Sequence, residues 1–331
     1  MILLSLACLN DHHAFFDDNL DPVVDFEHSA HEGLSTPYVR GTLVDITASL
    51  DGVRAFTSVS LVSSDPEVLD VVDHSTGDHV VTATVRAAGE GEARIELRDE
   101  HDQLLDARVV EVALPESITL EHEHTRRTGI EGGPDFALAT GGSGRYLATY
   151  LDDEGRRLAG SAVLSAHAPA WALNAQTDTA EDADWITLDA RAPAATELRL
   201  RVDGELIETR FIEVVDSDDV VAIRVEQESD IGRSSAATVH AWGVGELPDG
   251  TEVHGLDVVW STDDGELWWH GDTLSYHPDG PVTPVFATVG EVGGEGSVRV
   301  SGFVHPTGCS ATGLGASSML VLLGLLAVRR R

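Results

Sequence analysis

Apolar and polar residues alternate along most of this chain, and the alternation predicts β-strands. From Val44 to Leu50, every second residue is apolar, and Asp, Thr and Ser stand between them. A period of two is typical of a strand that buries one face. Similar runs follow as far as residue 300, and none of them has the apolar period of 3.6 residues that marks a helix. The pattern therefore predicts an all-β protein.

One group of predicted strands recurs after about 100 residues. Each copy consists of a β-hairpin, a short linker and the first strand of the next unit. The copies comprise residues 92–98, 107–112 and 118–121, and residues 196–202, 209–215 and 221–224. Asp203-Gly204 is the expected turn of the second hairpin, and Gly296–Ser301 is expected to open a third copy. In both complete copies apolar residues point one way, while Arg and Glu point the other.

Length and composition agree with a series of small β-domains. A chain of 331 residues has room for about two or three domains, and an apolar fraction of 42% is ordinary for folded proteins. The 32 Gly and 12 Pro supply many turns. We expect three tandem β-sandwiches, at residues 36–115, 116–216 and 217–305. Residues 9–35 are expected to form a flexible acidic tether.

Short motifs within these units resemble bacterial Ig-like domains of the BIG2 and invasin/intimin type. Leu61–Val68 and Val258–Gly265 resemble the "Trp-Ser-Ser-Asp-Pro-x-Val" region of that family, and Gly89–Ile95 resembles its "Gly-x-Gly-x-Ala-x-Ile" segment. Only the third predicted sandwich keeps the tryptophan, Trp260, which we expect to lie in the core. Residues 162–166 of the second predicted sandwich lack the Asp-Pro. The resemblance implies immunoglobulin-like β-sandwiches in an extended array.

The C-terminus has the three parts of a sorting signal. Gly308-Cys309-Ser310 precedes an apolar run from Met319 to Val328, and Arg329–Arg331 close the chain. That run is about 15 Å long as a helix, which is short of a bilayer. Counted back to Ala311 it becomes a marginal membrane span, so a plain C-terminal membrane anchor is the alternative to a sorting signal. Residues 306–331 resemble the myxobacterial-type C-terminal sorting signal (MYXO-CTERM), which implies export, processing near Cys309 and lipid anchoring at the outer surface.

The N-terminus is similar to a truncated lipoprotein signal. Ala7-Cys8 matches the cleavage point of a lipobox, and residues 1–8 supply a short Leu-rich stretch without a positive n-region. We expect export, with Cys8 as a second candidate for lipidation. The body of the chain between Cys8 and Cys309 contains no cysteine, so neither a structural disulfide nor a Cys-based zinc site is expected there.

The charge of the chain excludes one class of function. Its formal net charge is −36, every basic residue is Arg, and the residues after Cys309 carry no acid. Such a surface repels phosphate backbones, so no nucleic-acid partner is expected. The acidity fits either a saline habitat or an ordinary acidic surface, and the sequence does not choose between them.

Two groups of residues are candidates for binding. Asp216, Asp218 and Asp219 lie in the linker between the second and third predicted sandwiches. Bound Ca²⁺ could make this linker rigid, although solvated acidic turns explain the three aspartates as well. Trp268 and Trp269 are adjacent, so one is expected in the core and the other at the surface, where it could stack on a sugar or a partner.

The pair His122 and His124 would share one face of a strand and could reach one cation; a solvated strand face is the alternative. A Gly-x-Ser-x-Gly nucleophile motif is absent from the sequence, and a non-catalytic protein is expected. The sequence thus predicts an exported, lipid-anchored spacer or adhesion stalk, with sorting machinery and a surface protein or polysaccharide as partners. The alternative is a receptor module that binds Ca²⁺ or carbohydrate.

Overall fold

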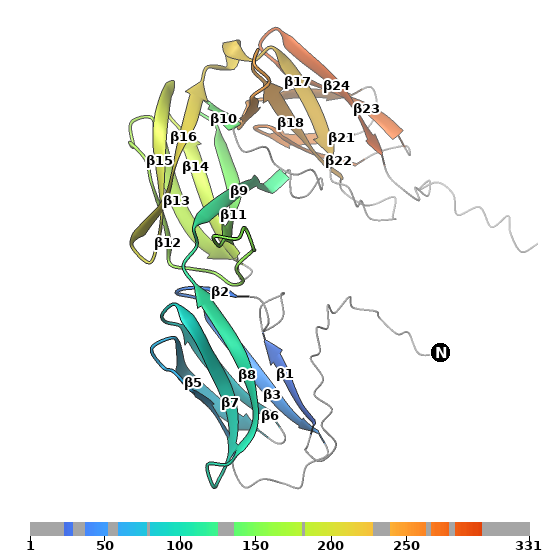
Figure 1. Cartoon of the computed structure of the whole chain (residues 1–331). Helices are drawn as coiled ribbons and strands as arrows, with labels where there is room; N and C mark the ends of the chain where they lie inside the picture. Colours follow the sequence, from blue (N-terminus) through green and yellow to red (C-terminus); the bar gives the residue numbers. More distant parts are fainter. Residues whose placement is uncertain are drawn as a thin grey trace, which may run out of the picture. The chain divides into compact units, whose positions relative to one another are not determined.

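The computed structural model (Figure 1) describes residues 23–28, 37–51, 59–77, 80–124, 136–180, 183–227, 239–262, 266–277 and 282–299. Strands dominate these ranges, and a short 3-10 turn lies at Ser217–Asp219. The chain divides into two compact units, one with strands β1 to β16 and the other with β17 to β24.

The first unit begins with a sandwich of two four-stranded sheets, ordered β1-β3-β6-β5 and β2-β8-β7-β4. Its strands are β1 Val23–His28, β2 Tyr38–Val39, β3 Leu43–Asp51, β4 Val59–Ser63, β5 Leu69–Gly77, β6 Val80–Ala87, β7 Gly91–Asp99 and β8 Leu104–Ala113. Alternate residues of β3 and β6 face inward, as Val44, Ile46 and Ala48 do in β3. The predicted alternation is thus confirmed in this strand.

Strand β1 corrects the expectation of a flexible tether for residues 23–28, while residues 9–22 and 29–35 lie outside the described residues. It pairs antiparallel with β3 along its whole length, from Val23 opposite Asp51 to His28 opposite Ile46. The short run Val23-Val24-Asp25-Phe26 has the composition of a strand, which the surrounding Asp and His residues obscured.

The second sandwich of the same unit is built from sheets ordered β13-β14-β11-β9 and β12-β15-β16-β10. Its strands are β9 Ser117–His122, β10 Phe136–Ala139, β11 Ser143–Leu151, β12 Leu164–His167, β13 Leu173–Ala180, β14 Ala183–Ala190, β15 Ala194–Val202 and β16 Glu205–Val215. The predicted turn between β15 and β16 is confirmed: Asp203 and Gly204 have φ of 51° and 82°. Positive φ at both residues is the signature of a type I′ hairpin.

The second unit contains a third sandwich. Strand β18 pairs with β17 and β22, and β21 follows on β22; the facing sheet is ordered β20-β23-β24. The strands are β17 Ala222–Gln227, β18 Val239–Glu246, β19 Glu252–His254, β20 Val259–Thr262, β21 Glu266–His270, β22 Thr273–His277, β23 Val282–Val289 and β24 Val292–Arg299. Short β19 pairs with the end of β18. Trp260 on β20 is buried, as predicted.

The strand order is the same in all three sandwiches. In one sheet it corresponds to A-B-E-D of the immunoglobulin fold, and in the other to C-F-G. In the first two sandwiches a short strand, β2 or β10, also runs parallel to the last strand. The prediction of an all-β chain of tandem immunoglobulin-like sandwiches is therefore confirmed by the topology.

The repeat in the sequence has a structural meaning, although its third copy was misplaced. In the two complete copies, β7, β8 and β9 correspond to β15, β16 and β17. Gly296 was expected to open the first of these strands, but it lies inside β24, the last strand of the third sandwich. Gly296 lies where β24 packs closely on β17, because an added Cβ would be 2.5 Å from Cβ of Val225.

Candidate functional site

A backbone joint connects the first two sandwiches within the first unit. Tyr38 of β2 forms a parallel bridge with Ala159, which lies in the loop between β11 and β12. The Val39 N–H donates to the carbonyl of Ala159 at 3.0 Å, and the Ala159 N–H donates to the carbonyl of Pro37 at 2.7 Å. Strand β2 thus pairs with β8 of its own sandwich and with a loop of the next.

The hydrophobic cores meet at the same joint. Tyr38 is 1% exposed and belongs to the first core, which Ala159 also enters. Val39 is fully buried in the second core, together with Leu158, and Leu114 of the linker packs against it. Each core therefore contains a residue contributed by the neighbouring sandwich.

Arg40 adds a cluster of ion pairs beside this backbone pairing. Its guanidinium lies 3.2 Å from Glu90 of the first sandwich, and 3.4 and 3.3 Å from Asp203 and Glu205 of the second. The Arg40 side chain is only 19% exposed. In so acidic a chain, one half-buried cation that serves three carboxylates relieves repulsion between them. A lone Arg between Val39 and Gly41 gave no indication of this role in the sequence.

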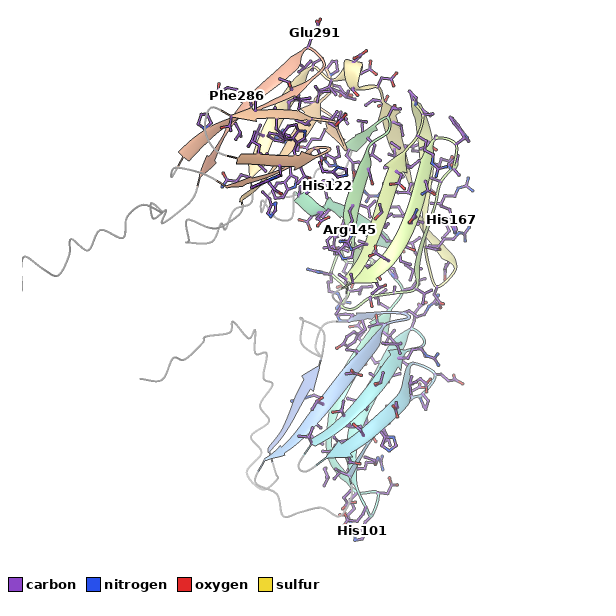
Figure 2. All side chains as sticks on the ribbon, turned by 180° about the vertical axis from the view of Figure 1, so that it is seen from behind. His101, His122, Arg145, His167, Phe286 and Glu291 are labelled. Carbon is purple, nitrogen blue, oxygen red and sulfur yellow. The ribbon has the colours of Figure 1, made fainter. Side chains whose placement is uncertain are left out.

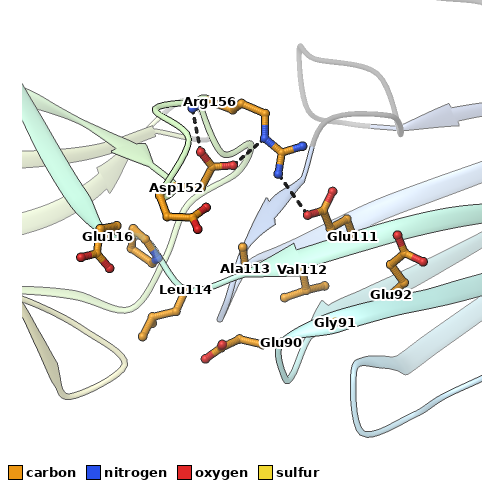
Figure 3. Close-up of a pocket in the computed structure, with 12 residues that line it drawn as sticks. Glu90, Gly91, Glu92, Glu111, Val112, Ala113, Leu114, Glu116, Asp152 and Arg156 are labelled. Carbon is orange, nitrogen blue, oxygen red and sulfur yellow. Dashed lines mark hydrogen bonds and ion pairs between the residues drawn. The ribbon is translucent and has the colours of Figure 1, made fainter.

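An acidic pocket of about 460 Å³ opens at the joint (Figure 3). Its charged lining consists of Glu90, Glu92, Glu111, Glu116, Asp152, Asp153 and Arg156. Arg156 Nε donates to Asp152 at 2.7 Å, and its Nη2 donates to Glu111 at 3.2 Å.

Asp152 closes the turn that carries Arg156. Its Oδ1 accepts from the N–H groups of Glu154 and Arg156 at 3.0 and 2.7 Å. Burial opposes ionisation of Asp152, but the hydrogen bonds from Arg156 and Glu154 outweigh it and lower the pKa. The pocket is therefore an acidic recess whose one arginine already pairs two of its carboxylates.

The three aspartates predicted for Ca²⁺ are all exposed. Asp216 follows β16, and Asp218 and Asp219 lie in the 3-10 turn Ser217–Asp219. Among the described residues, no group of three or more His, Cys, Asp or Glu side chains is arranged to hold a metal ion. The Ca²⁺ site at these residues stays a prediction.

Trp268 and Trp269 both lie in β21, at the edge of its sheet, and each is 48% exposed. The expectation that one of them is core is wrong, because an edge strand is incompletely covered on both faces. Opposite them on β22 lie Ser275 and the buried Leu274. Their role as ligand residues stays a prediction.

His122 ends β9 and is buried, so the solvated face is the wrong interpretation for this residue (Figure 2). Its ring lies 5.0 Å from that of Tyr146 and 4.6 Å from that of His124. Tyr146 in turn stacks on Phe136 at 4.3 Å. His122 therefore packs in a small aromatic cluster of the second sandwich.

Two further polar groups were not predicted from the sequence. In the second sandwich, the carboxylate of Asp184 accepts hydrogen bonds from Tyr150 Oη, the Ala162 N–H and Thr179 Oγ1, at 2.5, 2.6 and 2.7 Å. Burial raises the pKa of Asp184, although these three donors oppose the shift. Acidic residues are so common here that nothing in the sequence distinguished this one.

The other group lies in the second unit and is charged. Arg224 donates to Glu226 at 2.7 Å and to Glu252 at 2.5 Å, and His254 Nε2 lies 3.6 Å from Glu252. Interaction with His254 and then with Arg224 outweighs burial and lowers the pKa of Glu252 to about 2.

The candidate lipidation residues Cys8 and Cys309 lie outside the described residues, as do the apolar segments beside them. Within the part of the chain that the structure describes, no helix is long and apolar enough to span a membrane.

No protein-family profile matches the sequence, and no curated protein matches it. Among solved structures, domains 4–9 of surface layer protein SbsC are 17% identical, with 81% of this chain and 43% of that one covered and a TM-score of 0.37. The Escherichia coli adhesin FdeC is 15% identical over 86% of this chain and 100% of that one, with a TM-score of 0.26. The bacterial integrin-binding protein invasin is 9% identical over 83% of this chain and 60% of that one, with a TM-score of 0.25.

This chain thus spans less than half of the SbsC fragment that it matches. The immunoglobulin-like assignment rests on the strand order and not on these likenesses.

Proposed function

We propose that this chain is a non-catalytic cell-surface protein whose sandwiches serve as a spacer or adhesion stalk. In this proposal the chain is exported and held at the outer envelope, with lipid at Cys309 or Cys8. The C-terminal segment is recognised by sorting machinery, and a surface protein or polysaccharide is the partner.

The observation that carries the proposal is the tandem repetition of one sandwich, with the first two copies joined through their backbones and cores. A spacer needs domains that hold their ends at a defined separation, and a joint with shared cores does this better than a flexible linker. The surface suits an exposed position too. Intrastrand pairs such as Arg199 with Glu197 and Arg210 with Glu208 keep the outward faces of the strands polar.

Surface labelling of intact cells tests the proposal. An epitope inserted after His101, in the exposed turn between β7 and β8, should be reached by an antibody that does not cross membranes. Labelling only after lysis would contradict the surface location. Mass spectrometry of the mature protein then tests the anchor: the proposal expects a lipid-modified cysteine and loss of Arg329–Arg331, and an intact C-terminus on surface-exposed protein would contradict processing.

The alternative is a receptor module for carbohydrate or Ca²⁺. The half-exposed indoles of Trp268 and Trp269 favour the carbohydrate version, because aromatic faces at a strand edge can stack on sugar rings. Titration of purified envelope polysaccharide should then show binding that a Trp268→Ala, Trp269→Ala variant loses and a Trp171→Ala variant keeps, since Trp171 is also exposed but lies in the second sandwich. For Ca²⁺, calorimetry should show a rise in melting temperature that EDTA abolishes.

A further inference from the structure

We infer that the first two sandwiches fold and unfold as one cooperative unit, because each hydrophobic core is completed by a residue from across the joint. The inference concerns folding and does not depend on the proposed surface role. Separate β-sandwiches on one chain ordinarily keep separate cores and unfold independently of each other. Here Val39 fills the second core and Ala159 enters the first.

Loss of the first sandwich would damage the second in two ways. It would withdraw Val39, which is fully buried, and Leu114, which packs against the same core. It would also leave the N–H of Ala159 without the carbonyl of Pro37, a hydrogen bond of 2.7 Å. Ala159 is itself buried in the first core, so the same event would also expose its side chain to water.

The loop that carries Ala159 fits closely against the turn that follows Val39. Gly160 has φ of +89°, and an added Cβ would collide with the side chain of Thr42. Thr42 is buried, and its Oγ1 donates to the carbonyl of Val39 at 2.7 Å. Movement at the joint therefore disturbs both sandwiches together.

Charge acts in the same direction. Opening the joint would separate Arg40 from Asp203 and Glu205, and Arg156 from Glu111. Exposed ion pairs are individually weak, but these arginines lie among carboxylates that would otherwise repel one another. They therefore favour the closed joint over the open one.

Hydrogen exchange of the full-length protein, followed by mass spectrometry in increasing denaturant, tests the coupling. Peptides from β6 report on the first sandwich, peptides from β14 on the second, and peptides from β18 serve as an internal reference in the second unit. Leu97, fully buried in the first core, is changed to Ala. A truncation of this kind should lower protection by about 30-fold or more, and coupling requires the same factor in β6 and β14.

Ile95→Val is the milder variant, in case Leu97→Ala does not fold; an equal loss of about 2- to 12-fold is expected in both peptides.

In an Arg40→Gln, Gly160→Ala background, the loss caused by either core variant should become larger in β6 than in β14. Arg86→Gln is the matched control, because Arg86 pairs with Asp70 within the first sandwich and should leave the losses equal. A loss confined to β6 in the otherwise native protein overturns the inference. Equal losses in the Arg40 and Gly160 background would support coupling through Val39 and Ala159 without help from the ion pairs.

Discussion

Tyr38 and Val39 are consecutive in the chain, yet their side chains are buried in two different hydrophobic cores. Successive residues of a strand point to opposite faces, and β2 lies where one face meets the first sandwich and the other meets the second. Tyr38 and Val39 thereby connect the two sandwiches. Gly160, beside the bridge partner of Tyr38, is the residue at which this arrangement is most sensitive to added volume.

Gly160→Ala should destabilise the protein more than Gly155→Ala. Both glycines have positive φ, at +89° and +76°, so alanine is strained at either position by about 1 kcal/mol. Only at Gly160 would the new Cβ meet another group, the side chain of Thr42, whereas nothing lies within 4 Å at Gly155. Overpacking adds about 1–3 kcal/mol at the first site. Equal losses in denaturant-unfolding experiments on the two variants would show that Thr42 does not restrict this site.

Asp184→Ala should be among the most damaging changes in the second sandwich. The buried carboxylate accepts from three donors, and its removal leaves the Ala162 N–H and two hydroxyls without that acceptor, at a cost of about 3 kcal/mol or more. Tyr150→Phe removes one of these bonds and should cost about 1–3 kcal/mol.

Asp189→Ala is the matched control for Asp184. It lies on the same strand, is half-exposed and accepts from Ser143 and Asn174 at 2.9 and 3.0 Å. Its loss should cost about 1 kcal/mol, since water replaces the carboxylate. A thermal melt in which the Asp184 and Asp189 variants fall equally would contradict the central position of Asp184.

The sequence predicts those structural features that depend on local alternation or on local residue types. The inward faces of β3, β7 and β15 follow from alternation, and the Asp203-Gly204 turn follows from its residue types. The joint does not, because Tyr38 and Ala159 are brought together by tertiary pairing of a two-residue strand with a loop. The exposure of the candidate site residues was also not predicted, because it too depends on tertiary structure. Nothing local indicated that β21 is an edge strand, and therefore that Trp268 and Trp269 would both be half-exposed.

Acid should destabilise the second unit partly through Glu252. Its pKa is lowered from 4.5 to about 2 in the folded protein, so ionised Glu252 contributes stability above pH 4.5 that is lost as the pH falls towards 2. Glu252→Gln should therefore be less stable than the native protein at pH 6, and the difference should shrink by pH 2.5. Exchange of β18 amides over this range measures it.

Glu246→Gln is the control for Glu252. Glu246 lies at the position of β18 that pairs with Glu252, but no ion pair to an arginine involves it in the described part of the chain. Its substitution should leave the pH profile close to that of the native protein. A Glu252→Gln variant whose deficit is constant from pH 6 to 2.5 would contradict the lowered pKa.

The glycines of β24 should differ in their tolerance of alanine, although three of them lie within four residues. Gly296 approaches β17 so closely that a new Cβ would stand 2.5 Å from Cβ of Val225, and the backbone of one strand would have to move. Gly293 has room, since the nearest side-chain atom, Cγ2 of Thr288, would be 3.6 Å away. We therefore expect Gly296→Ala to cost about 1–3 kcal/mol through overpacking. Gly293→Ala should be neutral or stabilising by up to about 1 kcal/mol, because alanine restricts the unfolded chain. Exchange of β18 amides in the two variants measures the difference, and a Gly293 variant as unstable as the Gly296 variant would mean that strand flexibility, and not contact with β17, requires glycine here.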